Sequence, residues 1–350
     1  MAQKNSHLLV LRLSAMGDCA MAVPVLRRLA TTYPDLQITV LTKPFFRPIF
    51  EVIPQIEVIS AATDGRHKGL WGLWKLAREL HRSDFDLVAD LHNVLRSKIL
   101  RFFFMLFGWK SAKIDKGRAE KKALTRIKDK RFVPLKTSPQ RYADVFKDLG
   151  FPVDLSQKIP VKKPELSAEL ADFIGHSTKP WLGIAPFAAH ESKTYPEDLM
   201  KRLIAELDRA NRYKLLLFGG GKKEIPVLKE WASLFPNAIC AAGEFSFEKE
   251  IELIANLDLM LSMDSGNGHL AAMFRIPVIS LWGSTHPYAG FAPFGQPGEN
   301  QLTPDLKKYP LLPTSIYGKT GLPGYEDAMR SISTAQIMNR IEELLNSEDS

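Results

Sequence analysis

The sequence predicts an α/β protein built from two doubly wound parallel sheets. Short apolar runs alternate with amphipathic segments of helical period along most of the chain. The alternation lapses between residues 152 and 164, where three prolines fall among short polar pieces. At 350 residues the chain is also long for one hydrophobic core. We therefore expect two domains that face each other across a cleft.

In the first half of the chain, continuous apolar runs predict buried strands. The predicted strands are residues 8–13, 38–42, 56–59 and 85–91. Helical spacing of apolar residues predicts helices between and after them. The predicted helices are residues 20–30, 69–82, 97–107 and 142–149.

The second half repeats the alternation. The predicted strands are residues 181–186, 213–218, 238–241, 257–261 and 276–281. The predicted helices are residues 197–210, 222–234, 247–255, one that begins at residue 270, and 334–345. These elements divide the chain into a domain at 1–160, a linker at 161–179, a domain at 180–330 and a final helical segment at 331–350. The stretch 283–329 has seven Pro and seven Gly and little periodicity, which indicates a functional loop region.

The net charge of +8 is concentrated in one segment. Residues 96–131 contain thirteen Lys/Arg against three acidic residues, a local balance of +10, whereas the rest of the chain is near −2. This asymmetry favours an anionic partner. Aromatic residues from Phe102 to Trp109 accompany the cations, which favours an anionic membrane surface or a phosphorylated glycolipid. A basic loop beside a core helix is the simpler alternative. No nucleic-acid-binding module is visible, so nucleic acid is not expected.

Two cysteines, Cys19 and Cys240, form neither a disulfide framework nor a metal cluster, which suits a reducing compartment. The apolar run at residues 8–13 is too short for a signal-peptide core or a membrane span. We therefore expect a cytoplasmic protein, with peripheral contact at the cytoplasmic face of the inner membrane through segment 96–131.

A glycine-rich turn lies between two apolar runs near the end of the second domain. It comprises Asp264, Ser265, Gly266, Asn267 and Gly268. It follows a predicted strand and opens a helix, where backbone N–H groups can bind a phosphate. An ordinary helix N-cap is an equally good interpretation. His269 supports the ligand in the first interpretation and is a buried structural histidine in the second.

Two further turns leave the same predicted edge of the second sheet. One carries Lys193, which neutralises a phosphate or is simply a solvated surface lysine. The other contains Gly219, Gly220 and Glu224, where the carboxylate accepts from ribose hydroxyls or caps the helix. Together with the turn at Asp264, these loops favour a ligand that contains a diphosphate.

In the first domain, Met16, Gly17 and Asp18 follow the first strand. The Asp18 carboxylate is expected to face the cleft, although a carboxylate at a helix start is also explained by the helix dipole. The turn is not G-x-G-x-x-G, which argues against a nicotinamide dehydrogenase. The chain also has no Walker A motif, no H-E-x-x-H and no G-x-S-x-G.

Three motifs resemble glycosyltransferase family 9, the ADP-heptose:lipopolysaccharide heptosyltransferases. They are S-x-M-G-D at residues 14–18, F-x-x-x-x-x-K-x-Y-P at 187–196 and D-S-G-x-x-H-L-A-A at 264–272. The resemblance spans residues 8 to about 345. It implies the GT-B fold, with an acceptor domain, a nucleotide-sugar domain and a final helix that returns to the first domain.

The resemblance also implies roles and a reaction. Asp18 matches the general base that activates a sugar hydroxyl of the lipopolysaccharide core. Lys193 and the amides of residues 264–268 match the groups that hold the donor diphosphate, and Glu224 lies near the position of a nucleoside-binding carboxylate. The implied chemistry is an inverting displacement with no metal and no cofactor, in which the nucleotide-sugar is a substrate. The alternatives are a nucleotide-sugar epimerase or phosphorylase on the same fold, and a non-catalytic sugar-nucleotide-binding protein.

Overall fold

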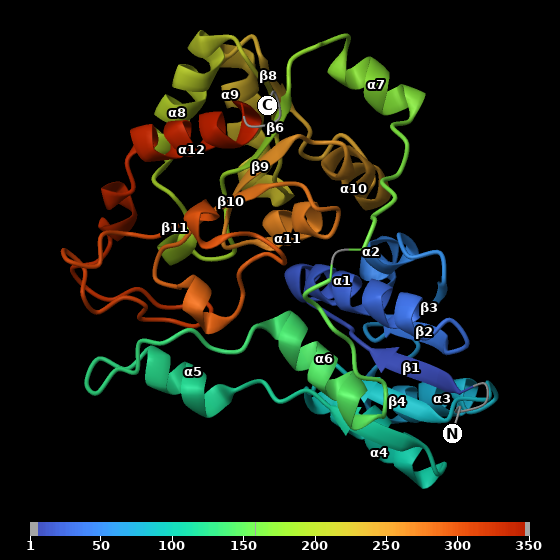
Figure 1. Ribbon diagram of the computed structural model, residues 1–350. Coiled ribbons are helices and arrows are strands. Elements are labelled where there is room, and N and C mark those ends of the chain that lie inside the picture. Colours follow the sequence, from blue (N-terminus) through green and yellow to red (C-terminus); the bar gives the residue numbers. More distant parts are fainter. Residues whose placement is uncertain (1–5, 158, 347–350) are drawn as a thin grey trace. The chain divides into compact units, whose positions relative to one another are not determined.

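The chain folds into two compact units in a computed structural model that describes residues 6–157 and 159–346 (Figure 1). Unit 1 is the chain up to Lys116 together with Ser138–Pro160. Unit 2 is Gly117–Thr137 together with the chain from Val161 onward. Each unit contains one parallel sheet connected through helices, which confirms the predicted fold class.

The sheet of unit 1 has five parallel strands in the order β3-β2-β1-β4-β5. The strands are β1 (His7–Leu11), β2 (Gln37–Thr42), β3 (Ile56–Ser60), β4 (Leu87–Asp90) and β5 (Lys110–Lys113). The helices of this unit are α1 (Met16–Thr32), α2 (Arg47–Glu51), α3 (Gly69–Leu80), α4 (Leu95–Leu106) and α6 (Ser138–Asp148). Residues Leu8 to Leu11 are completely buried, because a strand inside a parallel sheet is covered on both faces.

Several details of unit 1 differ from the expectation: α2 was not predicted, α4 and α6 begin two and four residues before their predicted starts, and two further differences concern α1 and β5. Helix α1 begins at Met16, four residues before the predicted start, so Asp18 lies in its first turn. Strand β5, Lys-Ser-Ala-Lys, was not expected, because an edge strand that is mostly exposed carries no apolar pattern.

The sheet of unit 2 has six parallel strands in the order β11-β10-β9-β6-β7-β8. The strands are β6 (Trp181–Ala185), β7 (Lys214–Leu217), β8 (Ala238–Cys240), β9 (Leu259–Met263), β10 (Val278–Leu281) and β11 (Gln301–Leu302). The helices are α5 (Arg118–Leu124), α7 (Ala168–Ile174), α8 (Glu197–Ala210), α9 (Gly221–Leu234), α10 (Phe247–Ala255), α11 (Gly266–Ala272) and α12 (Thr334–Asn346). Helices α8 and α10 have the bounds that their apolar spacing predicts.

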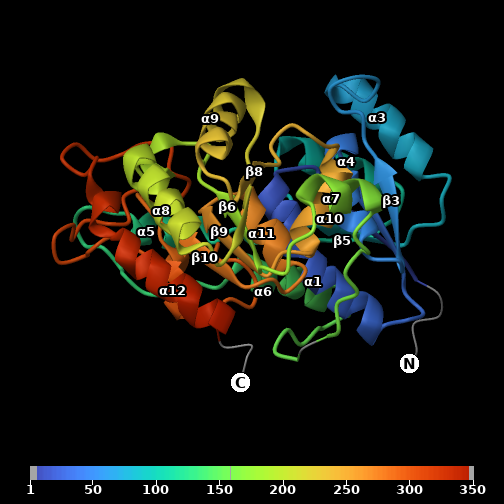
Figure 2. The same ribbon diagram turned by 90° about the horizontal axis from the view of Figure 1, so that it is seen from above.

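The final helix, α12, packs in unit 2. It lies against α8 and β9, as both views of the ribbon show (Figures 1 and 2). Its apolar side chains Ile337 and Ile341 are fully buried in the core of unit 2. The apolar stripe of α12 is thus covered by unit 2, and the expected return of residues 331–350 to the first domain stays a prediction.

The segment Gly117–Thr137 also differs from the predicted division, which placed it in the first domain. The Lys130 Nζ donates to the main-chain oxygens of Leu311 and Pro313, the latter at 2.9 Å. The Leu135 N–H donates to the Tyr288 oxygen at 2.9 Å. These bonds attach the segment, including α5, to the irregular loops of unit 2.

The expected linker at 161–179 is likewise part of unit 2. The Ser167 N–H donates to Glu252 Oε1 at 2.5 Å, and Asn256 Nδ2 donates to the Pro164 oxygen at 3.1 Å. Helix α7 follows directly, so these residues are anchored to α10 rather than free. Among the described residues, none of the helices combines the length and apolar character that a membrane crossing requires.

Candidate active site

In unit 1, Asp18 belongs to a cluster of polar side chains at the end of β1. Arg12, the first residue after β1, forms an ion pair with Asp18 through NH2 and donates through NH1 to the Leu91 oxygen at 2.6 Å. The Tyr142 hydroxyl, from α6, lies 3.5 Å from Asp18 Oδ1 and 3.4 Å from its main-chain oxygen. The Asp18 side chain remains 35 % exposed, so a substrate hydroxyl can approach it.

The charges in this cluster are fixed by burial and by the ion pair. Burial is the largest influence on Arg12 and opposes its charge, but Asp18, Tyr142 and Cys19 together more than offset it and raise the pKa of the guanidinium. Burial raises the pKa of the Tyr142 phenol and raises the pKa of Cys19 to about 12. Burial, with the cations Arg12 and Lys116, lowers the pKa of His92 to about 3. At neutral pH the neighbours of the partly exposed Asp18 are therefore a permanent cation, Arg12, and the neutral side chains of Tyr142, Cys19 and His92.

In unit 2, Lys193 and Asp264 form an ion pair. The Lys193 Nζ donates to the Asp264 main-chain oxygen at 2.7 Å and to its Oδ2 at 3.2 Å. The Thr285 hydroxyl donates to the same Oδ2 at 2.9 Å. The two charged side chains are only 11 % and 10 % exposed. Lys193 is thus not a solvated surface lysine, and the Asp264 carboxylate orients it instead of pointing at an anion.

The predicted turn at residues 264–268 opens α11, which begins at Gly266 rather than at residue 270. Ser265 occupies the N-cap position, but its side chain does not cap the helix. Within the described part of the chain, the buried Ser265 Oγ has no hydrogen-bond partner. Gly268 is required by close packing, because a Cβ there would lie 2.5 Å from Ser262 Oγ. His269 is buried in the same helix.

Both clusters lie at the switch points of their sheets, where strand order reverses and open α/β sheets bind ligands. In unit 1, Asp18 follows β1 and His92 follows β4, and these two strands are neighbours. In unit 2, Lys193 follows β6 and Asp264 follows β9, which are also neighbours. The topology therefore brings together residues that are far apart in the sequence.

The third predicted loop gives a different result. Glu224 Oε2 accepts from the Gly220 N–H at 2.8 Å and would lie 3.1 Å from a Cβ at Gly219. The carboxylate thus closes the start of α9, which is the capping interpretation. Gly219 and Gly220 lie at the surface end of β7 as expected, and nothing in this contact favours a nucleoside over a cap.

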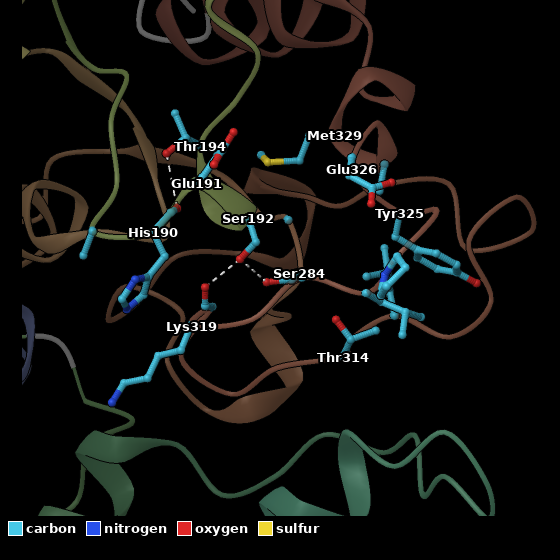
Figure 3. Close-up of a pocket in the computed structure, with 18 residues that line it drawn as sticks. His190, Glu191, Ser192, Thr194, Ser284, Thr314, Lys319, Tyr325, Glu326 and Met329 are labelled. Atoms are coloured by element: carbon cyan, nitrogen blue, oxygen red, sulfur yellow. Dashed lines mark hydrogen bonds between the residues drawn. The ribbon is translucent and has the colours of Figure 1, made fainter.

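A cavity of about 550 Å³ lies beside the Lys193 loop in unit 2 (Figure 3). Ser192 is at its centre: its hydroxyl lies 2.8 Å from Ser284 Oγ and donates to the Gly318 oxygen at 2.6 Å. Gly318 has a φ of +74°, and a Cβ there would lie 2.4 Å from the Lys193 stem. The loop after residue 310 therefore packs on Lys193. Lys319 and His190 lie on the same side of the cavity (Figure 3).

The basic segment 96–131 is divided by the fold. Residues 96–116 lie in unit 1, and 117–131 lie in unit 2. Some of the cations have structural partners, since Arg101 pairs with the buried Asp90 at 3.2 Å and the Lys121 Nζ lies 4.0 Å from the centre of the Phe291 ring. The segment therefore does not form one uniform surface, although its net charge of +10 stands.

Sequence reasoning missed the residues that orient the predicted ones, namely Arg12, Tyr142 and Thr285. Arg12 alone had a visible signal, since it interrupts an apolar strand. Over residues 6–157 and 159–346, no group of three or more His, Cys, Asp or Glu is arranged to hold a metal ion.

Solved structures share this architecture. A glycosyl transferase family 9 structure from Veillonella parvula has a TM-score of 0.77 at 21 % identity and covers 99 % of both chains. The E. coli heptosyltransferase WaaC with ADP has a TM-score of 0.68 at 17 % identity and covers 97 % of this chain and 99 % of its own. Two parallel-sheet units of this kind make up the GT-B fold.

The particular family follows from the sequence. The profile of "Glycosyltransferase family 9 (heptosyltransferase)" matches residues 73–308, and the chain belongs to this family. Lipooligosaccharide heptosyltransferase 2 of Haemophilus influenzae is 26 % identical in an alignment that covers 97 % of this chain and 99 % of the relative. Lipopolysaccharide heptosyltransferase 2 of Salmonella typhimurium is 25 % identical, with coverage of 97 % and 99 %. The chain is thus a glycosyltransferase, and neither the epimerase or phosphorylase nor the non-catalytic alternative is favoured.

Proposed function

We propose that this enzyme transfers heptose from ADP-heptose to a sugar hydroxyl of a lipopolysaccharide core, with inversion at the anomeric carbon. Support for the donor and the acceptor comes from the family, from relatives named as lipopolysaccharide and lipooligosaccharide heptosyltransferases, and from a similar structure solved with ADP. The observation that carries the proposal is the partly exposed Asp18 carboxylate, which is held by Arg12 at the switch point of unit 1.

In the proposed reaction, Asp18 takes the proton of the acceptor hydroxyl as its oxygen attacks the anomeric carbon. The bond from that carbon to the diphosphate oxygen breaks, and ADP leaves with the electron pair. Asp18 suits this task because the ion pair with Arg12 fixes one carboxylate oxygen and leaves the group partly open to solvent. General-base assistance of this kind contributes about 10²–10⁴-fold to the rate.

Lys193 is the proposed partner of the leaving diphosphate. Asp264 engages two of the three ammonium protons, which leaves one for a phosphate oxygen among the described contacts. The backbone amides of residues 265–268 and the Ser265 hydroxyl are the neighbouring donors, whereas the Asp264 N–H already donates to the Leu281 oxygen at 3.1 Å. Charge neutralisation by these groups is the reason to propose a reaction that needs neither metal nor cofactor.

The acceptor is an anionic glycolipid, so we also propose that the enzyme works at the cytoplasmic face of the inner membrane. The test is a transfer assay with purified enzyme, heptose-deficient lipopolysaccharide and ADP-heptose, in which released ADP and the extended lipid are both measured. The expected result is equal release of ADP and gain of heptose, unaffected by EDTA. Binding of ADP-heptose without turnover on any core acceptor contradicts the proposal, and loss of activity in EDTA contradicts its metal-free part.

A further inference from the structure

Helices α3 and α4 of unit 1 leave large apolar side chains in solvent. Trp71 is 83 % exposed, and Leu70, Phe102, Met105 and Leu106 are each more than half exposed. The opposite sides of both helices are buried in the core of unit 1, through residues such as Leu76 and Leu100. The exposed apolar residues are therefore not needed to hold the two helices on the sheet.

These side chains form one surface, because the two helices lie side by side. The Trp74 ring, on α3, is 5.0 Å from the Phe103 ring on α4 and 5.8 Å from the Phe107 ring that follows it. Trp71 lies one helical turn before Trp74, and Phe102, Met105 and Leu106 lie within one turn of Phe103. We call this surface, formed by Leu70, Trp71, Phe102, Met105 and Leu106, the α3–α4 face.

The same stretches are strongly basic. Residues 66–82 and 95–113 contain ten Lys/Arg and a single acidic residue, Glu79. Glu79 is engaged by His67 at 3.2 Å and by Arg66 at 3.5 Å. Lys75 and Arg78 follow Trp71 at helical spacing on α3, and Lys98 precedes Phe102 by one turn on α4; all three are exposed. Cations thus surround the apolar side chains of the α3–α4 face.

We propose that the α3–α4 face docks the enzyme on a bilayer surface that contains anionic phospholipids. A Trp among exposed Leu, Phe and Met residues suits insertion at the level of the lipid headgroups, and surrounding Lys and Arg side chains attract anionic headgroups. A nucleic acid is disfavoured, because the sequence contains none of the known nucleic-acid-binding modules. A second copy of the chain is disfavoured, because a symmetric contact sets two strongly basic surfaces against each other.

The inference deepens the proposed function by naming the surface through which the enzyme reaches a lipid-anchored acceptor. It rests on the proposed function for the reason why the enzyme binds a membrane, and not for the membrane binding itself. It also localises the expected membrane contact. The surface is formed by α3 and α4 rather than by segment 96–131 as a whole, part of which belongs to unit 2.

Flotation of the full-length enzyme tests the inference, with vesicles of phosphatidylcholine alone or mixed with phosphatidylglycerol. Binding is expected to the mixed vesicles and not to the neutral ones, and it should weaken as salt rises. Trp71→Ser combined with Leu106→Ser should lower binding by at least about tenfold. Leu234→Ser on α9, which removes another exposed leucine, is the matched control and should bind like the parent enzyme.

A second variant, Lys75→Glu with Lys98→Glu, reverses two charges without changing an apolar side chain and should also lose binding. It keeps the test decisive if the serine variant fails to fold. Equal binding to both kinds of vesicle, or unchanged binding of a folded variant, overturns the inference. A smaller oligomer for the serine variant on size exclusion overturns it as well, because the face then joins copies of the chain.

Transfer to a delipidated core oligosaccharide separates this inference from the proposed function. The serine variant should retain that transfer at the parent rate. Absence of vesicle binding with intact transfer overturns the docking surface alone, whereas vesicle binding without any transfer overturns the proposed function alone.

Discussion

Lys193 and Asp264 are joined at two points: the Lys193 Nζ lies 2.7 Å from the main-chain oxygen of Asp264 and 3.2 Å from its Oδ2. One of the partners follows β6 and the other follows β9, so the pair ties together the two central strands of unit 2. Because Thr285 also donates to Oδ2, the carboxylate is fixed from two sides. The position of the ammonium group is therefore set before any ligand arrives.

Asp264→Asn should weaken ADP binding, but less than Lys193→Met. The uncharged amide attracts the ammonium less strongly, so Lys193 is held less firmly, although its bond to the main-chain oxygen and its own charge remain. Each loss should be about tenfold to a hundredfold, the range of one or two charge-assisted hydrogen bonds. Titration calorimetry with ADP measures it, and Lys201→Met on the outer side of α8 is the control. Additive losses in the double variant would show that the two residues act separately.

Asp18→Asn should reduce the transfer rate by about 10²–10⁴-fold and leave ADP affinity unchanged. The amide is nearly isosteric but does not take a proton, so the loss measured on the folded variant reports the base. Because Asn also removes the charge that faces the buried Arg12, a thermal midpoint accompanies the assay. Single-turnover transfer and ADP calorimetry are the two measurements. Asp84→Asn, an exposed carboxylate of the same unit, should leave both unchanged. Transfer by Asp18→Asn near the parent rate would remove Asp18 from the mechanism.

Arg12→Lys should be more damaging than Tyr142→Phe. The guanidinium binds Asp18 and the Leu91 oxygen at once, and a lysine has one point of contact in place of this fork. We expect about tenfold slower transfer and a lower thermal midpoint for Arg12→Lys. Tyr142→Phe deletes only contacts of 3.4–3.5 Å and should cost less than about 1.5 kcal/mol of unfolding free energy. The reverse order of effects would mean that Tyr142, not Arg12, orients the carboxylate.

Glu250→Gln should stabilise the enzyme above neutral pH and not at pH 4. Burial raises the pKa of Glu250 to about 7, so the folded chain retains a proton that the unfolded chain releases near pH 4.5. The free energy of unfolding that protonated Glu250 contributes is therefore lost as the pH rises from about 4.5 to 7. This loss is about 2–3 kcal/mol, and the Gln variant does not undergo it. Thermal midpoints at pH 4.5 and 8 provide the comparison. Glu248→Gln, exposed on the same helix, should show no such pH dependence.

The sheets were predictable because buried parallel strands are continuous apolar runs, as in Leu8 to Leu11. The motif residues Asp18, Lys193 and Asp264 were also visible, since each follows such a run. Their partners were not: Tyr142 reaches Asp18 across 124 residues, and Thr285 reaches Asp264 only because β9 and β10 are neighbours. Such pairs depend on strand order, which no local pattern specifies.

Glu224, in contrast, makes a contact that a local pattern does predict. Its carboxylate accepts from the Gly220 N–H within one turn of the chain, which agrees with the capping interpretation. The return of α12 to the first domain stays a prediction. The apolar stripe of α12 predicts only that one face of the helix is covered, and in the structure this face packs against α8 in unit 2.

The excursion of Gly117–Thr137 into unit 2 has a consequence for dissection of the enzyme. The chain passes between the units three times, after Lys116, after Thr137 and after Pro160, so neither unit is one continuous stretch. A fragment that starts at Val161 would lack α5 and the lysine that binds the Leu311 and Pro313 oxygens. After a single proteolytic cut near Pro160, the N-terminal fragment would contain unit 1 together with residues 117–137, which belong to unit 2. Separate domains would therefore have to be made by circular permutation or by supplying residues 117–137 in trans, and not by truncation.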